Sequence, residues 1–174
     1  GVTLQDFASL KNQMIDSERN GYGTELSDIL LTFEEQTAMD PGVLMERFWD
    51  MFIVDAFIGN WDRHNGNWGF LYDTRTDEMA LAPVYDCGSS LYPQADEHIM
   101  ASVLEKPSEL NFRVYEIPTS AIMVNGKKLK YFDFLSSHQN EDCNRALKRI
   151  TSRIDMERIR QIIGNTPFIS DLQR

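Results

Sequence analysis

The chain has 174 residues, 42% of them hydrophobic, which is enough to bury one substantial core, so we expect a single domain over residues 1–174. Its 17 basic and 27 acidic side chains give a formal net charge of −10, which disfavours direct binding to nucleic acid or to an anionic membrane. The sequence shows neither a signal peptide nor an apolar run of about 18 residues, so we expect a protein of the cytoplasm with no membrane partner.

The charge is distributed unevenly along the chain. Residues 1–120 hold 7 Lys or Arg and 21 Asp or Glu, whereas residues 121–174 hold 10 and 6. The acidic part would repel polyanions and attract a divalent cation. A cation-dependent site is therefore more compatible with this part of the chain than a site for nucleic acid.

The first 35 residues predict two helices. Apolar Leu4, Phe7, Leu10 and Met14 recur at helical spacing, and "RNGYG" then interrupts the pattern with residues that favour turns. A second short helix is expected over residues 26–33.

A longer helix is predicted over residues 41–58. Asp40 is a favourable N-cap and Pro41 fits the first helical position. Gly59 and Asn60 supply a stop. Between these signals the many apolar residues leave almost no polar face, so the helix should be central and buried.

Two short apolar runs, "NWGFLYD" and "EMALAPVYD", predict a β-hairpin whose loop is centred on Arg75. Pairing around that centre would set Asn67 opposite a residue within 83–85. Asn67 and Asp86 should therefore meet at the open end of the hairpin, although they are far apart in the sequence.

The second half of the chain predicts further helices and another hairpin. Residues 87–110 have the composition of a loop, in which "DEHIMASVLEK" holds at most a turn or two of helix. A hairpin is expected over residues 121–132 on an Asn125-Gly126 turn, followed by one or two amphipathic helices broken near Asp155. The fold class is therefore α+β, mostly helical, with small β-hairpins.

The segment "NWDRHNGNWGFL", residues 60–71, gathers hydrogen-bonding side chains directly before a strand. Asn67 and Asp86 offer the hard oxygen ligands that suit Mg²⁺, an ion that prefers one or two carboxylates plus substrate phosphates. Asp62 could stand near the ion without binding it, free to orient a hydroxyl nucleophile. This arrangement is typical of phosphoryl transfer. The competing interpretation is a turn that caps a strand through Asx hydrogen bonds.

The other large residues of this segment have alternative roles. His64 could contact phosphate or hold the loop by hydrogen bonds. Arg63 could pair with phosphate or with a neighbouring carboxylate. Trp61 and Trp68 are expected in the hydrophobic core.

Three stretches carry a family resemblance: "DRHNGN", the strand "WGFL", and "LAPVYDCGSSL" over residues 81–91. They resemble the catalytic core of HipA-like kinases, bacterial Ser/Thr kinases of toxin–antitoxin systems. The order of the first stretch is also similar to that of phosphatidylinositol kinases, which share the protein-kinase-like fold. The resemblance implies that Asp62 is the catalytic base and that Asn67 and Asp86 bind the metal. Together with these two ligands, His64 would contact the nucleotide.

The resemblance implies the C-terminal lobe of a protein-kinase-like fold. No Gly-rich phosphate loop and no strand lysine in its usual setting precede residue 40. We therefore expect the N-terminal ATP-binding lobe to be supplied by the same polypeptide or by a separate chain. Cys87 also replaces the aromatic residue that many kinases carry after the metal-binding aspartate.

The implied activity is ATP- and Mg²⁺-dependent phosphoryl transfer to Ser or Thr of a protein substrate, with autophosphorylation. The resemblance also implies, for some members, an antitoxin partner that binds DNA. The implied location is the bacterial cytoplasm, or a host cell for a related branch. Two alternatives stay open: a non-catalytic lobe for nucleotide or partner recognition, and a lipid kinase, which the acidic charge disfavours.

Overall fold

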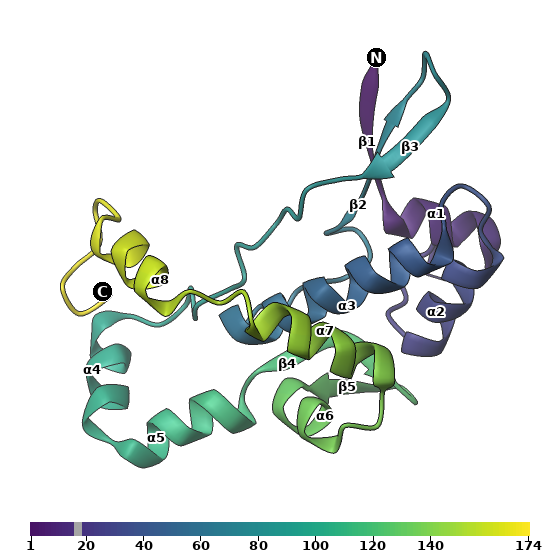
Figure 1. Cartoon of the computed structure of the whole chain (residues 1–174). Helices are drawn as coiled ribbons and strands as arrows, with labels where there is room; N and C mark the ends of the chain where they lie inside the picture. Colours follow the sequence, from purple (N-terminus) through teal and green to yellow (C-terminus); the bar gives the residue numbers. More distant parts are fainter. Residues whose placement is uncertain (16–18) are drawn as a thin grey trace.

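Helix α3 (Pro41–Ile58) runs through the middle of the computed structural model, which describes residues 1–15 and 19–174 (Figure 1). One face of α3 packs in the hydrophobic core with α1 (Phe7–Met14) and α2 (Leu26–Glu35), and these elements contribute most of its large side chains. The residues of α3 that reach this core are Leu44, Phe48, Trp49, Met51, Phe52 and Ile53.

The caps of α3 explain its bounds, which are as predicted. The Asp40 carboxylate accepts hydrogen bonds from the backbone N–H groups of Gly42 and Val43, at 2.7 and 3.1 Å. Gly59 ends the helix with a φ of 67°, a left-handed conformation that glycine adopts without steric cost.

Helix α3 is not apolar on its whole buried face, contrary to the expectation from its sequence. Phe57 is exposed, whereas Asp55 is buried, with 1% of its surface exposed. Because burying a lone carboxylate is costly, Asp55 needs a partner from another part of the chain. That partner lies in the candidate site.

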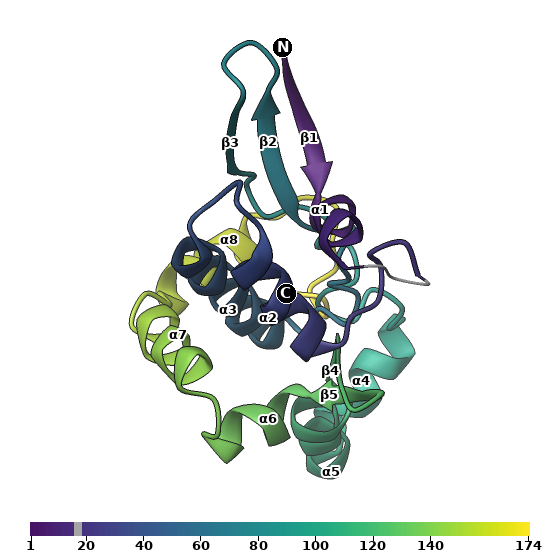
Figure 2. The ribbon, with the colours of Figure 1, turned by 90° about the vertical axis from the view of Figure 1, so that its right-hand side faces the viewer.

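A three-stranded antiparallel sheet stands at one end of the molecule, opposite α4 and α5 (Figures 1 and 2). Strands β2 (Gly69–Asp73) and β3 (Glu78–Leu81) form the predicted hairpin, with Phe70 opposite Leu81. Strand β1 (Val2–Asp6) pairs with the other edge of β2, so β2 is the central strand.

The expectation of a helix that includes Leu4 is wrong, because residues 2–6 form β1. Apolar and polar side chains alternate over these residues, which is the period of a strand. The Asp6 carboxylate then caps α1 by accepting a hydrogen bond from the Ser9 N–H at 2.8 Å, so the helix starts only at Phe7.

Trp68 lies in the core, as predicted, whereas Trp61 does not. The Trp68 ring stacks on Phe7 with centroids 4.3 Å apart, and it meets Phe33 edge-on at 6.1 Å. Trp61 is 42% exposed, while the preceding Asn60 is fully buried. The loop therefore buries the Asn60 amide and leaves the Trp61 indole at the surface.

The remainder of the chain adds helices and a second hairpin. In chain order the elements are α4 (Glu97–Glu105), α5 (Pro107–Asn111), a π-helical segment η1 (Phe112–Glu116), β4 (Thr119–Val124), β5 (Lys127–Lys130), α6 (Tyr131–Ser137), α7 (Glu141–Thr151) and α8 (Met156–Gly164). The predicted turn joins β4 to β5, with φ of 51° at Asn125 and 74° at Gly126. The predicted break at Asp155 is confirmed, because this residue caps α8.

Residues 87–110 are more helical than their composition predicts. The Asp96 carboxylate accepts a hydrogen bond from the Ile99 N–H at 2.8 Å and so starts a nine-residue helix, α4. Pro107 occupies the first position of α5, where its missing N–H costs nothing. Helix α6 was not expected either.

Helix α7 lies beside α3 (Figure 1), and an ion pair joins the two helices. Arg149 Nε and Nη2 donate to the Asp50 carboxylate at 3.0 and 2.6 Å. Arg149, one of the basic side chains of residues 121–174, is therefore paired with Asp50, one of the acidic side chains of residues 1–120.

We expect Gly69→Ala to lower the free energy of unfolding by about 1–3 kcal/mol, the usual cost of overpacking. A Cβ at this position would lie 2.1 Å from the backbone oxygen of Gln5, so β1 would have to move away from β2. Thermal and urea unfolding would measure the change. The matched control is Gly164→Ala in α8, where a Cβ meets nothing within 4 Å and stability should be unchanged or slightly higher. Equal stability of both variants would contradict the close pairing of β1 with β2.

Candidate active site

The loop between α3 and β2, residues 59–68, is folded around the backbone carbonyl of Asp62, and we call it the motif loop. That oxygen accepts hydrogen bonds from the His64 N–H at 2.8 Å and from Asn67 Nδ2 at 2.9 Å. The Asp62 N–H donates in turn to Asn60 Oδ1 at 3.2 Å. These bonds fix the backbone on both sides of Asp62, whereas its half-buried carboxylate makes no hydrogen bond with any described residue.

The side chain of Asn67 is held in one orientation by the same contact. Asn67 is buried, and donation from its Nδ2 to the Asp62 carbonyl fixes the plane of the amide. Within the described ranges its Oδ1 atom receives no hydrogen bond. An amide oxygen left free in this way is a hard ligand for a cation.

Asp86 lies on the segment that follows β3, and its backbone is brought to the motif loop by its neighbour Tyr85. The Tyr85 hydroxyl donates to the Gly66 carbonyl at 3.3 Å, and Arg63 Nη1 donates to the Tyr85 carbonyl. Asp86 itself is exposed and has a φ of 54°, a left-handed conformation that aspartate tolerates better than most residues.

Arg63 joins the parts of the site through a buried ion pair with Asp55 of α3. Its Nε lies 2.9 Å from Asp55 Oδ2, and its Nη2 lies 3.1 Å from Oδ1, so the contact is bidentate. Arg63 Nη1 also donates to the carbonyl of Asn67 at 2.5 Å, in addition to that of Tyr85. One guanidinium therefore ties the end of α3, the motif loop and the segment that carries Asp86.

The electrostatics of this pair follow from its burial. Burial raises the pKa of the Asp55 carboxyl, and the hydrogen bonds from Arg63 and Asn60 oppose that rise. For the Arg63 guanidinium, burial is the largest single influence and acts to lower the pKa, but the hydrogen bond and charge of Asp55, together with Cys87, outweigh it and raise the pKa overall. Arg63 thus stays charged, and Asp55 can stay ionised in the interior only while Arg63 stands beside it.

Sequence reasoning missed Asp55 and left the role of Arg63 open. The signal for Asp55 was present: it is the one charged residue in the apolar last two turns of the helix, shortly before the motif. An acid retained in such a helix indicates a buried partner. Nothing in the spacing, however, identifies Arg63 as that partner or the two carbonyls as its other acceptors.

His64 lies in the same turn, and its ring is oriented by two neighbours. Its Nδ1 accepts a hydrogen bond from the Gly66 N–H at 3.0 Å, and the ring meets Tyr22 edge-on with centroids 6.1 Å apart. A neutral imidazole that accepts at Nδ1 carries its proton on Nε2. His64 therefore retains one donor for another group.

The structure brings the expected site residues together to different degrees. Asp62 and Asn67 are in direct contact, His64 shares their turn, and Asp86 follows a residue held by the same guanidinium as Asn67. Within residues 1–15 and 19–174, no three His, Cys, Asp or Glu side chains gather as a metal cluster. A divalent cation at Asn67 and Asp86 would therefore need oxygen ligands from water or from a bound phosphate.

We expect Arg63→Met to lower the free energy of unfolding at pH 7 by about 3–5 kcal/mol, because it leaves Asp55 buried without a countercharge. The pKa of Asp55, already raised by burial, would rise further once the hydrogen bonds from Arg63 are gone. A carboxyl whose pKa is higher in the folded than in the unfolded state destabilises the folded state at pH values above its pKa in the unfolded state. Lowering the pH from 7 to 5 should therefore stabilise this variant.

Urea unfolding at several pH values would measure this recovery. The double variant Arg63→Met/Asp55→Leu is the control, because it removes both charges and should lose the pH-dependent gain. A single variant with no more stability at pH 5 than at pH 7, relative to this control, would contradict a buried and ionised Asp55.

Comparison with known proteins assigns the family. Residues 2–165 match the model of the HipA-like C-terminal domain. The chain is 49% identical over 172 residues to the serine/threonine-protein kinase CtkA of Helicobacter pylori strain J99, spanning 98% of this chain and 53% of that relative. The crystal structure of a Helicobacter pylori proinflammatory kinase CtkA superposes with a TM-score of 0.95 at 48% identity, over 99% of this chain and 63% of that one. This α+β, mostly helical chain therefore belongs to the HipA-like C-terminal domain family.

Proposed function

We propose that this chain forms the catalytic part of a Ser/Thr protein kinase that transfers the γ-phosphoryl group of ATP in a Mg²⁺-dependent reaction. The observation that carries the proposal is the Arg63 guanidinium, which binds the backbone at both Asn67 and Tyr85. The backbone of Asn67 and the residue before Asp86 are therefore held close to each other, and Asn67 also contacts Asp62. The similarity to a protein named as a Ser/Thr kinase supports the same activity, although the chain spans only 53% of that relative.

Asp62 would orient the hydroxyl group of the acceptor. Its backbone is fixed on both sides, whereas its carboxylate is not used by the described residues. A carboxylate placed in this way can accept the hydroxyl proton without being drawn into another hydrogen bond. In phosphoryl transfer such an aspartate positions the nucleophile and forms no covalent bond itself.

Asn67 and Asp86 would hold Mg²⁺, which when bound neutralises charge on the phosphates of ATP. Asn67 offers Oδ1, the amide atom that the loop leaves free. Asp86 offers an exposed carboxylate on the adjoining segment. His64 complements them, because its Nε2 carries the proton and can donate to a phosphate oxygen.

The groups that clamp adenine and phosphate would come from a nucleotide-binding lobe, in the same polypeptide or in a separate chain. We use "complete protein" for this chain together with that lobe. Because the chain belongs to the HipA-like family, we extend the proposal to autophosphorylation and, in a toxin–antitoxin setting in the bacterial cytoplasm, to an antitoxin partner. These assignments belong to the proposal.

The two alternatives differ from the kinase in measurable ways. A non-catalytic lobe would bind nucleotide or a partner without transferring phosphate. A lipid kinase would work at an anionic membrane surface, which residues 1–120, with 7 basic and 21 acidic side chains, would repel. Among the described residues, no helix combines the length and the apolar character that crossing a bilayer requires.

We expect Asp62→Asn to reduce phosphate transfer by the complete protein at least about a hundredfold, the contribution of a positioned base. Stability should change by less than about 0.5 kcal/mol, because the contacts of Asp62 run through its backbone. Incorporation of labelled phosphate from ATP into protein would measure transfer. The control is Asp133→Asn, an exposed aspartate of α6. Undiminished transfer by Asp62→Asn would exclude Asp62 as the base.

We expect Asp86→Asn to weaken binding of ATP to the complete protein at least about tenfold in the presence of Mg²⁺, and little in its absence, because a neutral amide is a poorer Mg²⁺ ligand. Asparagine also tolerates the left-handed backbone at this position, so the variant avoids the strain that alanine would add. Isothermal titration calorimetry would measure both affinities.

Asp77→Asn is the matched control, since Asp77 has a similar φ of 58° but lies in the hairpin loop. If Asp86→Asn and the wild type bound ATP equally tightly in the presence of Mg²⁺, Asp86 would be excluded as a Mg²⁺ ligand. Tight Mg²⁺–ATP binding by the wild type without any phosphate transfer would favour the non-catalytic lobe.

A further inference from the structure

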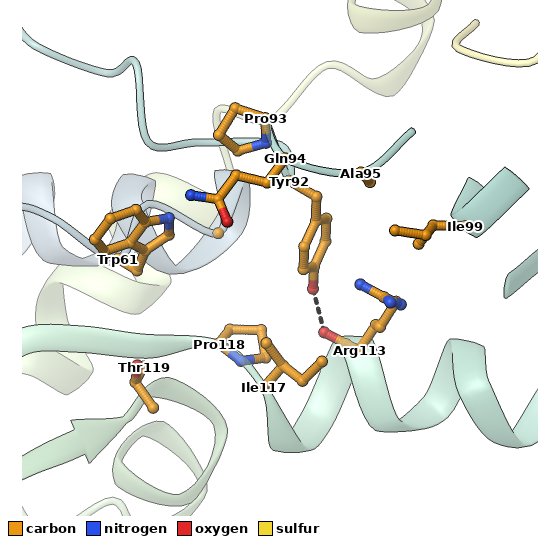
Figure 3. A pocket seen from close by; sticks show the side chains of 11 residues that line it. Trp61, Tyr92, Pro93, Gln94, Ala95, Ile99, Arg113, Ile117, Pro118 and Thr119 are labelled. Atoms are coloured by element: carbon orange, nitrogen blue, oxygen red, sulfur yellow. Dashed lines mark hydrogen bonds between the residues drawn. The ribbon is translucent and has the colours of Figure 1, made fainter. Parts of the chain in front are cut away.

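A groove opens at Gly59 and Trp61, at the start of the loop that carries Asp62 (Figure 3). It has a volume of about 380 Å³, and Trp61, the residue before Asp62, forms one of its walls. Tyr92, on the segment that follows Asp86, forms the facing wall. Arg113 of η1 lies on the side of Tyr92 that is away from Trp61. We call this cavity the Trp61 groove.

Trp61 is the one exposed tryptophan of the three in the chain. Trp49 and Trp68 are buried, with 1% and 3% of their surface exposed, whereas Trp61 is 42% exposed. Its indole faces the groove. A large apolar ring left open beside a catalytic loop gains free energy when a ligand covers it.

The opposite wall is built and held in place. Leu91 and Tyr92 have φ of 57° and 53°, a conformation that costs free energy for both residue types. Two long-range contacts maintain it: the Leu91 N–H donates to the Ile58 carbonyl at 2.8 Å, and the Tyr92 hydroxyl donates to the Arg113 carbonyl. The strained segment is thus fastened to α3 and to η1.

Arg113 places an unpaired positive charge in the groove. Its guanidinium carbon lies 5.7 Å from the centroid of the Tyr92 ring, which is a cation–π distance. The Nε atom is buried without an acceptor, and Arg113 forms no ion pair with any of the described residues. Residues 1–120 hold 21 acidic and 7 basic side chains, yet no carboxylate of the described residues forms an ion pair with this cation.

We infer that the Trp61 groove binds the segment of the protein substrate that flanks the phosphorylated Ser or Thr, and that Arg113 selects an acidic side chain in that segment. This inference rests on the proposed kinase function. An extended peptide lying across Trp61 would continue toward the loop that carries Asp62, because Asp62 follows Trp61 in the chain. One aromatic wall and one cation match a peptide with a single carboxylate better than a polyanion.

The binding test uses peptides of Ala and Gly with one central Ser and a single Glu moved through the flanking positions. Acrylamide quenching of tryptophan fluorescence in the 174-residue chain reports mainly on Trp61, because the other two indoles are buried. We expect one Glu position to protect Trp61 best and to bind about fivefold more tightly than its Gln counterpart, as an ion pair of about 1 kcal/mol implies.

Charge reversal tests the role of Arg113 directly. Arg113→Gln should abolish the fivefold preference, and Arg113→Glu should prefer the peptide with Lys at the same position. The matched control is Arg47→Gln, which removes a half-buried arginine that lines a different cavity, and it should keep the preference for Glu. A structural role for Arg113 would weaken all peptides alike and would not invert the preference.

The same peptides serve as substrates for the complete protein. Arg113→Gln should raise the KM for the Glu peptide about fivefold and leave kcat nearly unchanged, since Arg113 does not touch the reacting atoms. A preference for Glu that survives in Arg113→Gln, or a preferred residue without negative charge, would overturn the inference.

Two further outcomes are distinguishable. If Trp61 is protected without peptide in a manner that depends on protein concentration, a second copy covers the groove and the inference fails. If the Glu peptide binds and Arg113→Glu inverts the preference, but the complete protein transfers no phosphate, the kinase proposal fails while the groove still selects an acidic segment.

Discussion

The buried ion pair between Asp55 and Arg63 is the interaction on which the rest of the site depends. A charged pair in the interior is favourable only if its remaining donors and acceptors are also satisfied. Arg63 meets this condition with the carbonyls of Asn67 and Tyr85 and with a contact from Nη2 to Cys87 Sγ at 3.3 Å. The helix end is therefore stable only when the motif loop and the segment before Asp86 are assembled around it.

This dependence explains why the segment 60–67 holds so many hydrogen-bonding side chains. Asn60, Arg63 and Asn65 are buried and bind backbone or the buried Asp55, so they hold the loop. Asp62 and His64 lie between them and are less buried, and the Asp62 carboxylate and the His64 Nε2 donor make no hydrogen bond with the described residues. Asx-type bonds therefore do form the loop, and they leave the residues between them in the less buried positions that the proposed phosphoryl transfer would need.

The features that could be predicted from the sequence are those with local causes. Asp40, Pro41 and Gly59 determine the ends of α3 through contacts within a few residues, and the register of the β2–β3 hairpin follows from one short loop. Strand β1 was missed because its partner is distant in the sequence, so hydrogen bonding across the sheet outweighed an apparent helical spacing. The exposure of Trp61 was missed because apolar character alone does not show whether a side chain in a loop points into the core or toward solvent.

The C-terminal end of α3 is where the separate parts of the site meet. Asp55 holds the motif loop through Arg63, the Ile58 carbonyl accepts the Leu91 N–H of the groove wall, and the Asn60 carbonyl accepts the Tyr131 hydroxyl at 2.7 Å. These bonds come from three segments that are far apart in the sequence. Because one helix end positions them all, the motif loop and the groove are held relative to each other. In the proposed reaction, a substrate segment bound in the groove would therefore meet Asp62 at a fixed position, which is the geometry that efficient transfer requires.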